Sequence, residues 1–86
     1  MRFALRALPM STLLYKGHTI IAGAKRDTLA GQYKPLVDIA WQATGGKRDR
    51  HYFALPTRSA TFEEASAIAL AAAKAWVDRR LVDLGA

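Results

Sequence analysis

The sequence predicts an α+β fold in which a three-stranded antiparallel β-meander packs one face against a long C-terminal helix, with a four-stranded sheet as the alternative. Two observations carry this prediction. Residues 62–84 have helical periodicity without an internal glycine or proline, and residues 33–43 alternate apolar and polar side chains. A chain of 86 residues makes one domain, which we place at residues 12–86. We expect residues 1–11, which have no clear period, to form a flexible N-terminal segment.

The first part of the domain, residues 13–24, favours a strand because it contains Thr19, Ile20 and Ile21. Lys16 and Gly17 disturb the pattern, so Gly17 marks either a bulge or a tight turn between two short strands. Residues 24–32 are predicted to form the turn that follows, because they contain aspartate and glycine.

The strongest strand prediction covers residues 33–43. One face of this strand is apolar and carries Tyr33, Pro35, Val37, Ile39 and Trp41. Residues 44–50 are rich in glycine and charge, so we expect a basic loop there. Residues 51–55 make a short third strand that points Phe53 and Leu55 inward and ends at Pro56. The predicted order of elements is therefore β-β-β-α.

Thr61 and Glu64 form a capping box that predicts the start of the helix, and Gly85 is a typical residue just past a helix end. The helix has two apolar stripes. The stripe predicted to pack on the sheet consists of Phe62, Ala65, Ile68, Ala69, Ala72 and Trp76. The second stripe consists of Leu70, Ala73, Val77, Leu81 and Leu84. Either the N-terminal segment folds over this second stripe, or the stripe binds a protein partner or a second copy of the chain.

Composition argues against catalysis. The chain has no cysteine, which excludes disulfides, thiolate chemistry and cysteine-ligated zinc, and which fits the cytoplasm, where we expect the protein to act. No apolar run is long enough to span a bilayer, so we expect no membrane partner. We expect His18 at a turn or strand edge. Asp49 is two residues before His51 and could orient its imidazole, but the charged loop beside it favours a solvated histidine at a strand end. The sequence thus predicts no catalytic residue, no metal and no cofactor.

The net charge of +6 is unevenly distributed. Residues 1–60 carry ten lysines and arginines against three aspartates, whereas residues 61–86 carry three against four acidic residues. This asymmetry favours nucleic acid or another polyanion as partner. The candidate binding residues are Lys16, Lys25, Arg26, Lys34, Lys47, Arg48, Arg50 and Arg58.

We expect Lys25 and Arg26 in one turn and Lys47, Arg48 and Arg50 in the next loop, at opposite ends of the sheet. Two readings remain open beside nucleic-acid binding. The cations could be solvated loop charges that keep a small domain soluble. Alternatively, the domain could bind a protein or itself through the second helix stripe, with Leu70, Val77, Leu81 and Leu84 at the interface, or through a free sheet edge.

A three-stranded sheet followed by an alanine-rich helix resembles the double-stranded RNA-binding domain at the level of the fold. In that family, lysines at the start of the last helix hold phosphates, whereas this chain has Glu63 and Glu64 there. The same order of elements resembles the plant ethylene-response DNA-binding domain and the arm-binding domain of phage integrases. Those domains read a groove with arginines and tryptophans on the open sheet face, but here the strand offers Leu36, Asp38 and Ala40.

The chain is most similar to small uncharacterised bacterial proteins that start with an aromatic-basic-glycine turn and end with an alanine-rich helix. The matching residues are Tyr15-Lys16-Gly17-His18, Phe62 to Ala67, and Trp76-Val77-Asp78, so the resemblance covers residues 12–84. It implies a β-β-β-α fold and a cytoplasmic setting. It implies no activity, and therefore no functional residue.

Overall fold

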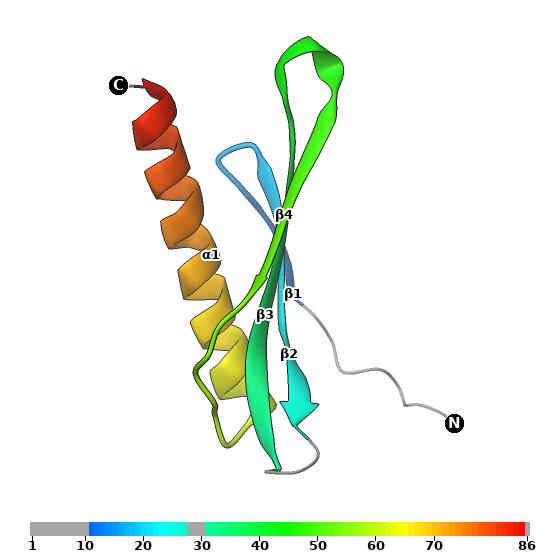
Figure 1. Ribbon diagram of the computed structural model, residues 1–86, viewed down its shortest axis with the longest axis vertical. Helices are drawn as coiled ribbons and strands as arrows, with labels where there is room; N and C mark the ends of the chain where they lie inside the picture. Colours follow the sequence, from blue (N-terminus) through cyan, green and yellow to red (C-terminus); the bar gives the residue numbers. More distant parts are fainter. Residues whose placement is uncertain (1–10, 28–30, 86) are drawn as a thin grey trace, which may run out of the picture.

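The computed structural model describes residues 11–27 and 31–85. Its elements are β1 (Ser11–Tyr15), β2 (His18–Asp27), β3 (Gln32–Gln42), a short 3₁₀ turn η2 (Thr44–Gly46), β4 (Arg48–Ala54) and α1 (Phe62–Gly85). The four strands form one antiparallel sheet in the order β1-β2-β3-β4, and α1 lies along one side of it (Figure 1). The four-stranded alternative is therefore confirmed. The predicted flexible segment lies outside the described residues, except for Ser11, which begins β1.

Gly17 belongs to a turn and not to a bulge. Tyr15 pairs directly with His18, so only Lys16 and Gly17 connect β1 to β2. Both residues have positive φ angles, 49° and 78°, as a two-residue hairpin turn of the primed type requires. This turn divides the predicted first strand into two strands.

The strands are longer than the hydrophobic pattern predicts. β2 continues to Asp27, which pairs with Gln32, and β4 begins at Arg48, which pairs with Gln42. The predicted turn at 24–32 and the predicted loop at 44–50 are therefore both too long. The physical reason is that the main-chain hydrogen bonds of a ladder do not depend on apolar side chains, so the pairing continues where the side chains face solvent.

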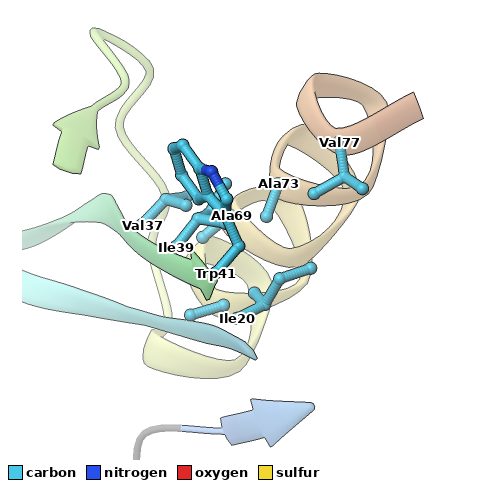
Figure 2. Packing of buried hydrophobic residues seen from close by; sticks show 8 residues of the cluster. Ile20, Val37, Ile39, Trp41, Ala69, Ala73 and Val77 are labelled. Carbon is cyan, nitrogen blue, oxygen red and sulfur yellow. The ribbon is translucent and has the colours of Figure 1, made fainter. Parts of the chain in front are cut away.

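The core lies between α1 and strands β2 and β3. From the sheet it contains Ile20, Ala22, Val37, Ile39 and Trp41, and from the helix it contains Ala69, Ala73 and Val77 (Figure 2). Ala65 is also fully buried, so the buried helix row follows every fourth residue. Because alanine is small, the helix can approach the sheet closely.

The rotation of the helix differs in part from the prediction. Ala65 and Ala69 are buried as expected, whereas Phe62, Ile68, Ala72 and Trp76 are only half-buried. Ala73 and Val77, predicted in the second stripe, are fully buried. A row spaced by four residues advances by about 40° per step around a helix of 3.6 residues per turn. Such a spiral row can follow a twisted sheet, and this explains why the core row passes from one predicted stripe to the other.

The start of the helix is confirmed. The backbone N–H of Glu64 donates to Thr61 Oγ1 over 3.1 Å, and the N–H of Ala65 donates to the Thr61 carbonyl oxygen over 3.1 Å. Glu63 and Glu64 lie in the first turn, where the helix dipole favours negative charge. Within the described residues, no helix is long and apolar enough to cross a membrane.

Candidate functional site

The sheet face opposite the helix is the candidate site, and we call it the open face. Successive strand residues point to opposite sides, so the neighbours of the buried Ile20, Val37 and Ile39 point away from the helix. The strand register then defines the central positions of the open face on three strands. They are Thr19, Ile21, Gly23 and Lys25 on β2, Lys34, Leu36, Asp38 and Ala40 on β3, and Arg48, Arg50, Tyr52 and Ala54 on β4.

Four of the eight predicted cations share this face. Lys25 lies directly opposite Lys34 at one end of the β2–β3 pair. Arg48 and Arg50 lie near the other end of β3, opposite Gln42 and Ala40. The prediction that Lys25, Arg48 and Arg50 belong to loops is wrong, because all three are strand residues. Their strand positions give them a common direction, which loop positions would not.

The other four predicted cations lie elsewhere. Arg26 is an exposed residue of β2 whose strand position points to the helix side, so its assignment to a turn is also wrong. Lys16 belongs to the β1–β2 turn, and Lys47 follows the 3₁₀ turn. Arg58 follows β4, and its Nε lies 3.7 Å from Asp27 Oδ2. Arg58 therefore lies at the end of the sheet where β2 ends.

Asp38 and Arg50 form an ion pair on the open face. Arg50 Nε donates to Asp38 Oδ1 over 2.9 Å and to Oδ2 over 3.2 Å, and Arg50 Nη2 donates to Oδ2 as well. These hydrogen bonds lower the pKa of the Asp38 carboxyl below its usual value and raise the pKa of Arg50. The carboxylate is thus neutralised by a fixed guanidinium, which leaves the face positive.

Lys16 is held against the helix and away from the open face. Its Nζ lies 2.7 Å from Asp78 Oδ1, and the Tyr15 hydroxyl donates to the same carboxylate over 3.0 Å. The hydrogen bond with Asp78 raises the pKa of Lys16, and the hydrogen bonds from Lys16 and Tyr15 lower the pKa of Asp78. Among the described residues, Lys25, Lys34, Lys47 and Arg48 form no ion pair. Three of these four unpaired cations, Lys25, Lys34 and Arg48, are on the open face.

The open face is hollowed beside the two arginines. A depression of about 480 Å³ is lined by Thr19, Ile21, Asp38, Ala40, Arg48, Asp49 and Arg50. A second depression of about 250 Å³ adjoins it and shares Thr19, Ala40 and Arg48 with it. Ala40 lies opposite Arg50 on the neighbouring strand, and its small side chain contributes to the hollow.

Both histidines pack against tryptophan rings. His18 begins β2 directly after the hairpin turn, as expected, and its side chain is buried. Its Nδ1 donates to the Lys16 carbonyl oxygen over 2.8 Å, and its Nε2 accepts from Arg80 Nε over 3.2 Å. The guanidinium of Arg80 also lies 4.3 Å from the Trp41 ring centre. No group of three potential metal ligands occurs among the described residues.

His51 stacks on Trp76 with ring centres 4.6 Å apart, so it is half-buried and not in solvent as predicted. Trp76 in turn lies 5.4 Å from Trp41. These rings fix the end of the sheet that carries the β3–β4 connection. The signal that the sequence analysis missed is the strand period, because His18 shares the direction of Ile20 and His51 shares that of Phe53.

The residues proposed for a protein interface are divided by the structure. Val77 is fully buried in the core and cannot contact a partner, which corrects its assignment. Leu70 is half-buried and packs against the same core. Leu81 and Leu84 are exposed on the last turns of α1. Of the four residues predicted at a protein interface, Leu81 and Leu84 are thus the two that are exposed to a partner.

Comparison of the chain with protein-family models, with curated proteins and with solved structures finds no match in any of the three.

Proposed function

We propose that this domain is a non-catalytic module that binds nucleic acid through the open face of its sheet, weakly and with strong dependence on salt. The observation that carries the proposal is the alignment of Lys25, Lys34 and Arg48 on one face without an ion pair among the described residues. Asp49 lines the hollow beside Arg48, and its carboxylate accepts a hydrogen bond from the Arg50 backbone N–H. By register, the carboxylates at open-face positions of the described strands β2–β4 are Asp27 and Asp38. Both are paired with arginines.

The spacing of the cations favours an extended polyanion over a single phosphate. Lys34 and Gln42, the partner of Arg48, are eight residues apart on β3, which corresponds to about 26 Å at 3.3 Å per residue. One small anion cannot contact both ends of this row. A duplex carries one charge per about 1.7 Å of axis, so it can present phosphates to both ends at once.

The open face is suited to contact the backbone more than the bases. Tyr52 is the one aromatic residue at the open-face positions of β2–β4, and it is exposed. Binding to single strands by stacking uses several such rings, so one tyrosine contributes a contact with one base at most. Phosphate contacts fix position without reading sequence, and we therefore expect little sequence preference.

The likeness to small bacterial β-β-β-α proteins supports the fold on which this proposal depends. Its three motifs occupy the hairpin turn at Lys16-Gly17, the capped start of α1 and the Trp76–Asp78 segment that contacts the sheet and β1. Each has a structural role here, so the likeness supports the fold and identifies no ligand. A cytoplasmic location, which the lack of cysteine favours, would give the domain access to both DNA and RNA.

The test is fluorescence anisotropy with labelled random-sequence duplex DNA, single-stranded DNA and RNA at 50 and 200 mM salt. Three phosphate contacts predict a slope of about −2.7 in log affinity against log salt for duplex DNA. This slope corresponds to about a 40-fold loss of affinity over that range. Undetectable binding at 50 mM salt to all three probes would overturn the proposal.

Charge-removal variants locate the contact. Each of Lys34→Gln and Arg48→Gln is expected to reduce the slope by about 0.9, the value for one phosphate contact on duplex DNA. Arg79→Gln is the matched control. Arg79 is exposed on α1, so this substitution removes the same charge from the helix side of the sheet. An effect of Arg79→Gln equal to that of Arg48→Gln would show that net charge, and not the open face, accounts for the binding.

A further inference from the structure

The two edges of the sheet differ in charge. The edge strand β4 contains Arg48, Asp49, Arg50 and His51, and charged side chains on an edge oppose pairing with another strand. The edge strand β1 has the sequence STLLY and contains no charge. Its Leu14 is 73% exposed. Among the described residues, β1 has a neighbour only on the β2 side, so β1 lacks the protection that β4 has.

The helix extends this uncharged edge with apolar surface. Asp78 accepts a hydrogen bond from Tyr15 of β1, and Lys74 Nζ lies 5.6 Å from the centre of the same ring. Residues three and four positions apart share one side of a helix, so Leu81 and Val82 lie on the same side as Asp78. Val82 is 69% exposed, and Leu81 is exposed as well. Leu14 pairs with Thr19 and so points to the open face, whereas Leu81 and Val82 lie on the helix side of the sheet. We call the outer edge of β1, with Leu14 on one face and Leu81 and Val82 on the other, the β1 flank.

We propose that the β1 flank binds a second copy of this chain, with the two β1 strands paired antiparallel about a two-fold axis. Such pairing centred on Leu13 places Ser11 opposite Tyr15 and Thr12 opposite Leu14 of the other copy, so no charge faces another charge. A two-fold contact uses the same patch on both copies, and STLLY is compatible with itself in this way. The equivalent pairing of β4 would bring arginines of both copies together.

The distribution of charge also favours β1 over the other described strands as the place where two copies meet. The unpaired cations of the open face are on β2, β3 and β4, so the repulsion between two basic chains is least at β1. Five residue pairs alone bury little area, whereas a stable interface buries about 800 Å² per partner. The apolar residues of the helix are therefore needed beside the strand, and we expect a weak dimer.

The test is the mass of the full chain in the absence of nucleic acid, by sedimentation equilibrium from 5 to about 500 μM, a range that covers weak, transient interfaces. The expected result is a rise from the 9.4 kDa of the monomer toward twice that value. A mass that stays at 9.4 kDa over the whole range would overturn the inference. The proposed nucleic-acid binding would be unaffected by that result, because it does not require a dimer.

Substitutions test the position of the contact. Leu14→Lys and Val82→Lys are each expected to raise the dimer dissociation constant by at least about tenfold. Leu14→Lys brings like charges together near the axis, and Val82→Lys places a charge in the apolar part of the interface. Leu84→Lys is the matched control. Leu84 is 65% exposed but lines a hollow with Trp76 and Arg80 on the β4 side of the helix. Equal effects of Val82→Lys and Leu84→Lys, or no effect of Leu14→Lys, would exclude the β1 flank. Circular dichroism checks that each variant is folded.

Discussion

Val77→Ala tests the packing that positions both proposed surfaces. Val77 is fully buried at the C-terminal end of the helix row that packs on the sheet. The substitution removes two methyl groups, which costs about 1.6 kcal/mol at about 0.8 kcal/mol per buried carbon, and the residual cavity adds to this loss. Alanine has the higher helix propensity, which returns about 0.5 kcal/mol. We therefore expect a net loss of about 1–2 kcal/mol in the free energy of unfolding.

Val82→Ala is the matched control, because it makes the same change five residues later in the same helix, where the side chain is 69% exposed. Its helix-propensity gain cancels in the comparison, so the two variants are expected to differ by about 2 kcal/mol. The assay is urea unfolding followed by tryptophan fluorescence and circular dichroism, at two protein concentrations, so that self-association does not enter the comparison. Equal stabilities of the two variants would refute the helix orientation, and with it the position of the β1 flank.

Two other predictions concern the hairpin turn and the ion pair of the open face. Gly17→Ala is expected to lower the free energy of unfolding by about 1 kcal/mol, because Gly17 has a φ angle of 78° that other residues adopt only at a cost. A Cβ at this position would meet no atom within 4 Å, so the cost is conformational and not steric crowding. An unchanged melting temperature in a thermal melt would contradict the turn. Hydrogen bonding to Arg50 lowers the pKa of Asp38 in the folded protein below its ordinary value of 3.8. The ion pair therefore stabilises the fold fully at pH values above 3.8, and this stabilisation is lost as the pH falls from 3.8 through the pKa of the folded state. Arg50→Gln should reduce that acid-dependent loss, measured by urea unfolding at several pH values between about 3 and 6, and an identical pH profile for both proteins would contradict the pair.

The inward face of β3 could be predicted because a strand has a period of two and its apolar residues are large. Val37, Ile39 and Trp41 are buried as expected. The rotation of α1 could not be predicted with the same success, because alanines occur on several sides of the helix and give little contrast between them. The row containing Ala73 and Val77 differs from the predicted row mainly in how it follows the sheet's twist, which the sequence of the helix does not encode by itself.

The gathering of cations on one face depends on strand ends, which the pattern of apolar residues does not reveal. Lys25 lies beyond the last buried residue of β2, and Arg48 lies at the exposed start of β4, where main-chain pairing defines the structure. The Asp38–Arg50 pair has the same origin. Arg50 lies opposite Ala40, so it is a diagonal neighbour of Asp38 across the two strands. That relation requires the register of the β3–β4 hairpin, and a loop assignment for residues 44–50 excludes it.

The two proposals together predict how binding depends on the length of the nucleic acid. Pairing of β1 with its copy separates the two β2 strands by three strand spacings, or about 14 Å, and the sheet twist turns the second open face by about 60–75°. A duplex longer than one open face could then contact both copies, and the second contact would benefit from a high effective concentration. The affinity of the wild-type chain should therefore rise more between 12- and 48-base-pair duplexes than the number of sites explains. Val82→Lys should remove this extra gain while Leu84→Lys keeps it, although both variants add the same charge. If the two variants show the same length dependence, the sheet is not shared between copies when it binds nucleic acid.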